Sequence, residues 1–374
     1  MTDIDALQIA AAAPSNDMPL DGIDHLELYV GNAKQAAAFY VSALGFREVA
    51  YAGLETGRRD SASHVLEQGG IRLVLTGALV PDHAVGRHVA AHGDGVRTIA
   101  LGVPDAEHAH RLAVARGARS VAAPWSDADS DGEVVRASVR AYGEIVHTFV
   151  ERGSYRGAFL PGYSARDGAG SDVGLLAVDH IVGNVELGEM ETWVGFYERV
   201  FGMTELNHFT DEAISTEYSA LMSKVVSDGS GRIKFPINEP AEGRRRSQVD
   251  EFLEFHGGPG VQHLALTTED IVGTVARLRE RGIEFLRTPD SYYDELPDRV
   301  GEIDEPVGEL RRHGILADRD EEGYLLQVFS RPLADRPTLF LEVIERHGAT
   351  GFGQGNFKAL FEAIEREQDR RGNL

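Results

Sequence analysis

The sequence predicts an α+β fold built from repeated modules in which strands alternate with short helices. The segment from Ile23, IDHLELYVGNAKQAAAFYVSALGF, returns from Val178 as VDHIVGNVELGEMETWVGFYERVFGM. A second pair joins GVRTIALGVPDAEHAHRLAVARGARSV from Gly95 to GVQHLALTTEDIVGTVARLRERGIEFL from Gly260. Each copy reads as a strand, then a helix ended by glycine, so each half of the chain contains two strand–helix units.

The spacing of apolar residues supports the helices. One stripe recurs at i, i+3, i+4, i+7 and i+8 and is closed by Gly202; its members are Trp193, Phe196, Tyr197, Val200 and Phe201. Near the end of the chain, a second stripe predicts a closing helix over 356–370 with one buried face; its members are Phe357, Leu360, Phe361 and Ile364.

Strand-like runs lie around these helices. Apolar or alternating stretches of strand length occur at 72–75, 145–150, 232–237, 324–329 and 338–343. The segment 154–175 is rich in Gly, Ser and Asp and lacks either period. We therefore expect a flexible tail at 1–20, a first domain at 21–153, a linker at 154–175 and a second domain at 176–374.

Composition excludes several classes of function. The chain of 374 residues has 60 acidic against 37 basic residues and a net charge of -23, which repels nucleic acid and anionic lipid. The basic triplet Arg244–Arg246 reads as a solvated surface. The first 20 residues lack the basic start and apolar core of a signal peptide, and no stretch reaches membrane-spanning length, so we expect a cytoplasmic protein.

Candidate metal ligands lie in the strands of the second half. The sequence has no cysteine, so a metal must be held by His and carboxylates. His180 and His263 occupy matching strands, and Glu342 lies in the last strand. Strand alternation lets all three point into one curved sheet. Two imidazoles and one carboxylate suit a non-heme iron(II) oxygenase, although zinc hydrolases use the same set.

Each of these residues taken singly has an ordinary explanation as a hydrogen-bonded strand residue. Comparison with the first half favours the ligand hypothesis. The aligned positions there are interpreted as His25, Thr98 and Glu151, so the first domain is expected to lack a complete metal site. His88 and His92 share a helix face at i and i+4, but with no carboxylate in a matching frame we interpret them as part of a surface helix.

At these residues the chain resembles the vicinal-oxygen-chelate superfamily, also called glyoxalase-like, whose βαβββ modules pair into open barrels around a metal. Within it, the second half is similar to the 4-hydroxyphenylpyruvate dioxygenase family through several long motifs in the same order: VDHIVGNVELG, EYSALMSKVVSDGSGRIKFPINEP, GPGVQHLAL, LLQVFSRP, RPTLFLEVIERHG and GFGQGNFKALFEAIEREQ. The resemblance covers the chain from about Gly22 to Leu374.

The resemblance implies one Fe(II) per subunit, held by His180, His263 and Glu342. It also implies a set of residues that contact the substrate, namely Ser223, Asn238, Gln248, Gln262, Gln327, Phe329, Phe352 and Phe357. Gln262 adjoins His263, so strict alternation would separate the two side chains unless the strand bulges. The three phenylalanines also have a simpler interpretation as core residues.

The implied reaction converts 4-hydroxyphenylpyruvate and dioxygen to homogentisate and carbon dioxide, in tyrosine and phenylalanine catabolism. The 2-oxo acid of the substrate would chelate iron, and the closing helix would act as a lid. Exposed apolar edges of such half-barrels often pair between subunits, so we expect a homodimer or homotetramer.

Three alternatives stay open. A 4-hydroxymandelate synthase would use the same fold, metal and substrate but would oxidise the benzylic carbon. More distant possibilities are an extradiol catechol dioxygenase and a non-enzymatic binding protein of the same modular fold. The aromatic residue at Phe357 and the sequence around Pro236 and Asn238 favour ring hydroxylation.

Overall fold

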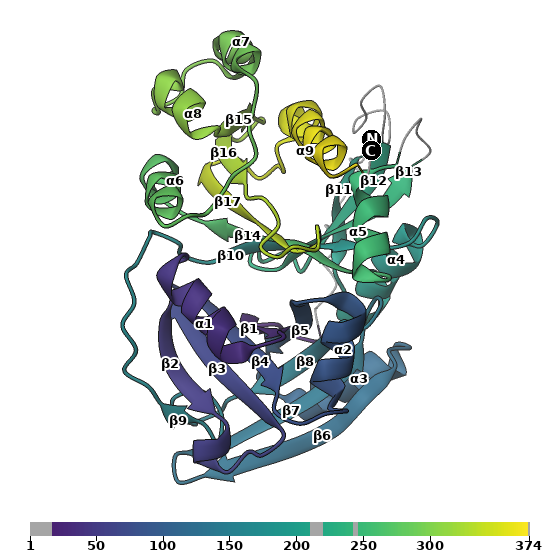
Figure 1. Ribbon diagram of the computed structural model, residues 1–374. Helices are drawn as coiled ribbons and strands as arrows, with labels where there is room; N and C mark the ends of the chain where they lie inside the picture. The colour runs from purple at the N-terminus through teal and green to yellow at the C-terminus, as the bar shows by residue number, and fades with distance from the viewer. Residues whose placement is uncertain (1–16, 210–219, 242–245, 373–374) are drawn as a thin grey trace, which may run out of the picture.

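The chain is folded around two mixed sheets, seen in a computed structural model that describes residues 17–209, 220–241 and 246–372 (Figure 1). In these residues the strands form one nine-stranded and one eight-stranded sheet. The first half of the chain makes the nine-stranded sheet, at the bottom of Figure 1, and the second half makes the other. This is the α+β class that the sequence predicts.

The first half contains the following elements: β1 (Gly22–Tyr29), α1 (Ala33–Ser42), β2 (Arg47–Ala52), η1 (Leu54–Thr56), β3 (Ser61–Gln68), β4 (Ile71–Ala78), α2 (Ala84–His92), β5 (Gly95–Gly102), α3 (Ala106–Ala115), β6 (Ser120–Asp129), β7 (Gly132–Arg140), β8 (Val146–Glu151) and β9 (Ser164–Ala165). The first half thus contains two groups of four strands, β1–β4 and β5–β8, and both groups end before the predicted linker at 154–175.

The second half contains the following elements: β10 (Val178–Asn184), α4 (Met190–Phe201), β11 (Thr204–Phe209), β12 (Ala220–Ser227), β13 (Lys234–Ala241), α5 (Gln248–His256), β14 (Gly260–Thr267), α6 (Ile271–Glu280), α7 (Asp290–Val300), α8 (Val307–His313), β15 (Leu316–Arg319), β16 (Tyr324–Phe329), β17 (Phe340–His347), η2 (Gln354–Asn356) and α9 (Phe357–Arg371). Helices α7 and α8 are additions that periodicity did not predict.

The two sheets have the same strand order. In the first sheet it is β6-β7-β8-β5-β1-β4-β3-β2-β9, and in the second, read from its other edge, it is β15-β16-β17-β14-β10-β13-β12-β11. In both, the two modules meet at a central antiparallel pair, β1 with β5 and β10 with β14. Each half is therefore two βαβββ modules joined edge to edge into a curled half-barrel, as the resemblance implies.

Local sequence explains where the predicted helices begin and end. Gly202 ends α4 in the left-handed conformation, at φ 68°, which a glycine adopts without the steric cost that a Cβ brings. At α5, Ser247 accepts the backbone N–H of Asp250, while the Asp250 carboxylate accepts the backbone N–H of Ser247. This reciprocal pair fixes the start of α5, which bears on the site described below.

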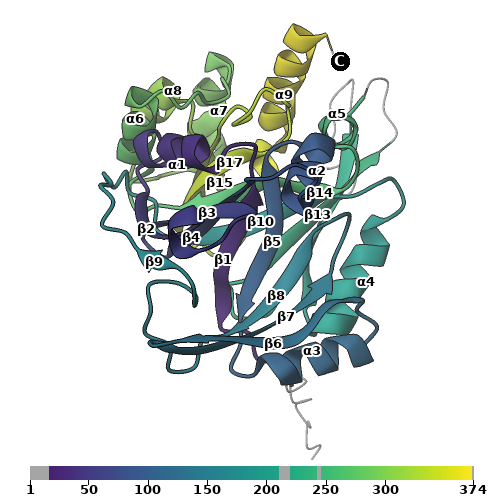
Figure 2. The same cartoon turned by 60° about the horizontal axis from the view of Figure 1, so that its bottom comes forward.

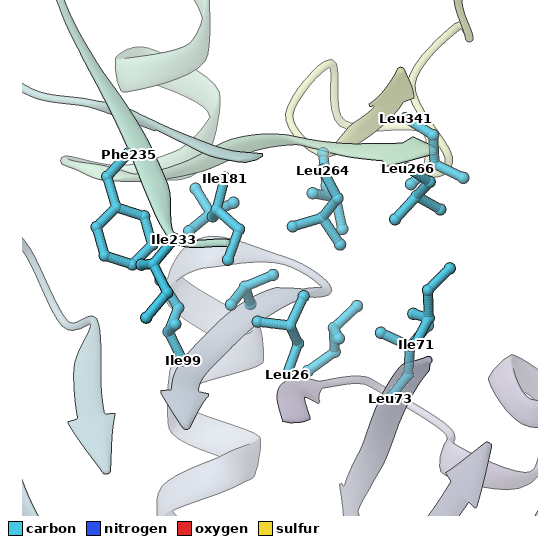
Figure 3. Close-up of a cluster of buried hydrophobic side chains, with 14 of the residues drawn as sticks. Leu26, Ile71, Leu73, Ile99, Ile181, Ile233, Phe235, Leu264, Leu266 and Leu341 are labelled. Atoms are coloured by element: carbon cyan, nitrogen blue, oxygen red, sulfur yellow. The ribbon is translucent and has the colours of Figure 1, made fainter. Parts of the chain in front are cut away.

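The main hydrophobic core lies between the two sheets. Leu26 and Ile99 project from the first sheet toward Ile181 and Leu264 of the second, and all four are at most 1% exposed. Figure 3 shows these side chains meeting from the two sides. Because side chains alternate along a strand, the neighbours of these residues, His180 among them, point to the opposite, concave face of the second sheet.

The predicted linker is packed rather than loose. Tyr155, Phe159 and Leu160 are buried in a separate cluster on the first sheet, and β9 pairs with β2 at its edge. In Figure 2 this segment runs from β8 along β9 at the outside of the first sheet before it enters the second. The division into two domains at this segment remains a prediction.

Across the described helices, none combines the length and the apolar character needed to cross a bilayer. The basic triplet Arg244–Arg246 lies partly outside the described residues. The part of the predicted tail before Asp17 lies entirely outside them.

Candidate metal centre and substrate cavity

The three predicted ligands come together on the concave face of the second sheet. Glu342 Oε2 lies 3.1 Å from His180 Nε2 and 3.3 Å from His263 Nε2. All three residues are buried: Glu342 is 2% exposed, His180 is 4% exposed and His263 is 8% exposed. Strands β10, β14 and β17 are adjacent in the sheet, which places the three side chains side by side. Their role as ligands remains a prediction, but their convergence is a finding.

The second ring nitrogen of His180 is bound to a carboxylate. His180 Nδ1 donates to Asp179 Oδ1 at 2.7 Å. Asp179 is in turn held by Lys234 at 3.1 Å and by Arg346 through two hydrogen bonds of 2.8 and 2.9 Å. Burial opposes the charged form, but His180 and Arg346 hold the pKa of Asp179 well below its usual range. The Asp179 carboxylate thus fixes the tautomer that leaves the Nε2 lone pair of His180 facing Glu342.

His263 is oriented by its neighbour in sequence. Its Nδ1 lies 3.0 Å from Gln262 Oε1, and its ring stacks on Phe340 at 4.8 Å between centroids. The register between β10 and β14 shifts here, with Val182 opposite His263 and the next pair formed by Gly183 and Val261. Gln262 is therefore the extra residue of a bulge. This confirms the condition under which Gln262 and His263 can serve one site.

The electrostatics of the three residues favour a bound cation. Burial raises the pKa of Glu342, but the adjacent imidazoles outweigh it and lower the value to about 2. For His263, burial lowers the pKa, which keeps the ring neutral and able to donate a lone pair. For His180, burial lowers the pKa, but the charge of Glu342 outweighs it and raises the value. A cation among the three would take the place of that proton.

A cavity opens beside the three residues. Seven of the eight predicted substrate residues line it, namely Ser223, Asn238, Gln248, Gln262, Phe329, Phe352 and Phe357. Pro236, which the sequence places on one strand face with Asn238, also lines the cavity. Sequence reasoning did not assign the remaining aliphatic and aromatic walls, which are Val182, Leu221, Val225, Phe340, Leu360 and Phe361. The cavity is apolar with a few polar groups, as is common for sites that bind an aromatic small molecule.

Each polar group is brought to the cavity by a different element. Ser223 in β12 and Asn238 in β13 are cross-strand partners, and Gln248 is the first residue of α5. Asn238 Nδ2 donates to Asn184 Oδ1 at 3.3 Å. Phe352 packs edge-on against His180 at 5.1 Å, so the segment before α9 covers the side of the cavity that His180 lines.

Gln327 is the predicted residue that the structure leaves out of the lining. Its side chain is 1% exposed, and it lies so close to Gly353 that a Cβ there would come within 2.4 Å of Gln327 Nε2. Among the described residues, this Nε2 has no hydrogen-bond partner. Gln327 thus supports the turn that leads into α9, where only a glycine leaves enough space.

Asp179 is a residue of the site that sequence reasoning missed. A signal was available, because the dipeptide Asp–His occurs at the same place in both repeats, as Asp24–His25 and Asp179–His180. In the first half, His25 Nδ1 also binds Asp24 Oδ1, at 2.6 Å.

The pairing of strands corrects one alignment made from the sequence. Ala265 pairs with Glu342 in the second sheet, and the equivalent Ala100 pairs with Thr148 in the first. The counterpart of Glu342 is therefore Thr148, and the interpretation of Glu151 as that counterpart is wrong. Glu151 instead accepts the backbone N–H of Ala106 at the start of α3.

At the positions equivalent to the three candidate ligands of the second half, the first half has one imidazole and two threonines, namely His25, Thr98 and Thr148. The expectation that it lacks a complete site of this kind is consistent with that arrangement. The donor set in the second half, two neutral-capable imidazoles and one charged carboxylate with both Nε2 atoms facing inward, fits a divalent transition metal.

Known proteins share both the sequence and the fold. The model of the Glyoxalase/Bleomycin resistance protein/Dioxygenase superfamily matches residues 22–145 and 177–328. Proteins named 4-hydroxyphenylpyruvate dioxygenase are similar to this chain: one from Danio rerio is 46% identical, covering 94% of this chain and 91% of its own length. Another, from Dictyostelium discoideum, is 45% identical over 95% of this chain and all of its own length.

A solved structure agrees with these relatives. A mutant of 4-hydroxymandelate synthase from Streptomyces coelicolor superposes with a TM-score of 0.85 at 39% identity, covering 94% of this chain and 100% of its own. The chain therefore belongs to the Glyoxalase/Bleomycin resistance protein/Dioxygenase superfamily and, within it, to the 4-hydroxyphenylpyruvate dioxygenase family.

Proposed function

We propose that this protein is a 4-hydroxyphenylpyruvate dioxygenase that uses Fe(II) to convert 4-hydroxyphenylpyruvate and dioxygen to homogentisate and carbon dioxide. One observation carries the proposal. The buried cluster of His180, His263 and Glu342 opens directly onto a cavity walled by aromatic side chains, as a site for an aromatic substrate requires. The relatives that cover nearly the whole chain carry the same name.

In this proposal His180, His263 and Glu342 hold one iron, which supplies a chelation site for the 2-oxo acid and the redox chemistry of dioxygen activation. Asp179 and Gln262 keep both Nε2 lone pairs aimed at that position. Both contacts are made by residues of the protein itself, and partners of this kind hold imidazole rings in the orientation that metal binding needs.

The cavity walls orient the substrate ring and exclude water. Phe329, Phe352 and Phe357 provide faces and edges for a planar ring. Helix α9 carries Phe357, Leu360 and Phe361, and together they close the apolar side of the cavity. A dry cavity confines oxidation to the substrate.

Polar groups of the lining suit the phenol and the acid. Ser223, Asn238 and Gln248 present hydroxyl and amide groups to the cavity. Gln262 contacts His263, so it can contact the keto acid end of a substrate bound there. We do not assign Gln327 to direct contact, because it lies against Gly353 instead.

A second candidate is 4-hydroxymandelate synthase, which the similarity to the Streptomyces coelicolor structure supports. The two enzymes would use the same metal and substrate and differ in the carbon that is oxidised. The choice rests on the shape of the cavity around Phe357 and on the higher identity to the dioxygenases.

The test is anaerobic reconstitution of the purified protein with Fe(II), followed by oxygen uptake and product chromatography with 4-hydroxyphenylpyruvate. We expect homogentisate with equal consumption of oxygen. Hydroxymandelate would keep the fold and metal but replace the proposed reaction. No uptake, together with cleavage of a catechol or stoichiometric ligand binding, would replace it with an extradiol dioxygenase or a binding protein.

Three further predictions accompany this function and need their own measurements. The protein is predicted to be cytoplasmic and to form a homodimer or homotetramer, and residues 176–374 are predicted to be the catalytic domain. Analytical ultracentrifugation decides the oligomeric state, and limited proteolysis in 154–175 tests the domain boundary.

A further inference from the structure

A second group of candidate metal ligands lies in the first half, on the side that faces the second. His88 and His92 project from one face of α2, and Glu144 reaches them from the turn between β7 and β8. Glu144 Oε2 is 2.7 Å from His88 Nδ1 and 3.7 Å from His92 Nε2. His88 is 5% exposed, so it lies on the buried face of α2. The carboxylate that the sequence did not pair with these histidines belongs to Glu144, 56 residues from His88 along the chain, which periodicity along one helix could not reveal.

The distances suit a small divalent ion. The candidate ligand atoms all lie within 4.8 Å of one another. Ligands about 2.0–2.1 Å from a tetrahedral Zn²⁺ are separated from each other by about 3.3 Å, and the two distances to Glu144 fall on either side of this value. Side chains four residues apart on a helix are a common pair of metal ligands, as at this face of α2.

The His92 ring is held in the orientation that a ligand needs. Its Nδ1 donates to the backbone carbonyl of His256 at 2.7 Å, which leaves the Nε2 lone pair facing Glu144. The ring also stacks on His256 at 4.7 Å between centroids. Glu144 is 48% exposed at its side chain, so the fourth position is open to solvent and an ion can enter.

The cluster lies where three segments from both halves meet. Helices α2 and α5 are neighbours in both ribbon views (Figures 1 and 2). The turn that carries Glu144 packs on the second half, since a Cβ on Gly143 would come within 2.3 Å of the Pro259 carbonyl. Arg336 from the second half donates to the carbonyls of Ala90 and Ala91 at the end of α2.

The cationic groups at the border of the cluster are engaged elsewhere. Arg97 donates to the backbone carbonyl of Glu144 and Arg336 to carbonyls of α2, so neither guanidinium forms an ion pair with the Glu144 carboxylate among the described residues. The overall charge of -23 further favours a cation.

The other group of this kind among the described residues is less suited to an ion. Glu305, Glu345 and His347 also lie close together. However, Glu345 accepts the backbone N–H of Ile271 at 2.7 Å, and Glu305 accepts the hydroxyl of Tyr324 at 3.1 Å. These carboxylates already complete local hydrogen bonds.

We propose that His88, His92 and Glu144 form a second divalent-metal site, for an ion of the Zn²⁺ class, that ties α2 and the β7–β8 turn together at the junction of the two halves. The ion has a structural role, because the cluster shares no residue with the cavity. Its binding stabilises the folded chain and links α2, through His92, to the end of α5.

The test measures Zn²⁺ binding by equilibrium dialysis on the full chain with His180→Ala and Glu342→Ala, which removes the first group of ligands. We expect one Zn²⁺ per chain and a rise in Tm on its addition. Adding Glu144→Gln or His92→Gln should weaken binding at least tenfold and remove the Tm shift. Glu144→Gln is the decisive variant, because this exposed side chain can be changed without opening the core.

Matched controls separate this site from others. His110→Gln changes a histidine on α3 whose hydrogen bond is to Ser120, and it should leave Zn²⁺ binding unchanged. The proposal is overturned if the chain with His180→Ala and Glu342→Ala binds no Zn²⁺. It is also overturned if Glu144→Gln and His92→Gln leave the binding of Zn²⁺ intact. Loss of binding on His347→Gln alone would assign the ion to the Glu305 cluster instead and overturns it equally.

Discussion

The side chains of Asp179 and His180, adjacent in β10, are joined by a hydrogen bond of 2.7 Å, and this contact orients the ring toward Glu342. Adjacent residues of a regular strand point to opposite faces, so such a contact requires an irregular strand. The register of β10 against β14 indeed shifts between Val178 and His180. The orientation of the candidate ligand thus depends on a backbone irregularity next to it.

Replacing Asp179 should weaken the metal site without removing a ligand. We expect Asp179→Asn to lower the affinity for Fe(II) by about 10- to 100-fold, because the charge that fixes the His180 ring is lost. Competition with a chromophoric chelator under anaerobic conditions measures this. The matched control is Asp24→Asn, which breaks the equivalent pair in the first half. Equal Fe(II) affinity in the two variants would contradict the positioning role.

Removing Glu342 should abolish turnover. We expect Glu342→Ala to lose iron and oxygen uptake. The fold should be kept, because the neighbours of Glu342 in β17 are buried apolar residues that hold the strand in the sheet. Iron content and circular dichroism test the two parts. Glu345→Gln, on the same strand but bound to the start of α6, is the control and should keep its iron. An active, iron-loaded Glu342→Ala would disprove the ligand assignment.

Phe357 should influence which product forms. Its ring lines the cavity from the first turn of α9, and an aliphatic side chain there would leave room for the substrate to shift. We expect Phe357→Ile to direct part of the flux from homogentisate to hydroxymandelate, measured by product chromatography. Phe255→Ile, on α5 and outside the cavity lining, is the control. An unchanged product ratio would remove Phe357 as a determinant.

Acid should destabilise the contact between the two halves through His147. Burial lowers the pKa of His147 to about 4, and its ring lies against Phe201 and Phe235 and 2.8 Å from the Tyr197 hydroxyl. Between its ordinary value of about 6.5 and 4, the unfolded chain binds a proton that the folded chain does not. Stability contributed by the neutral ring is therefore present above pH 6.5 and falls as pH decreases, by about 1.4 kcal/mol per pH unit.

Urea unfolding between pH 7 and pH 4 measures this slope. We expect His147→Gln, which cannot titrate, to be less stable at pH 7 but to show a shallower loss toward pH 4. His256, whose pKa burial also lowers to about 4, contributes a similar slope that remains in the variant. Identical slopes for the variant and the parent would exclude His147 as the source.

Much of the architecture follows from periodicity in the sequence. The helix closed by Gly202, the strand at 324–329 and the closing helix that begins at Phe357 all occur as predicted, because each depends on neighbours within a few residues. Helices α7 and α8 were not predicted. Their polar sequences give weak periodicity, and only packing of Tyr293, Leu296 and Leu310 against the second half orders them.

The sequence by itself determined the repeated modules and the type of side chains available to a metal, and its family resemblance implied seven of the fourteen residues that line the cavity beside the three candidate ligands. Only the tertiary structure decided how these side chains are aimed. The bulge at Gln262, the counterpart role of Thr148 and the meeting of Glu144 with His88 all depend on strand register or on contacts between distant segments. Such contacts are set by the packing of whole sheets, which no local pattern of residues encodes.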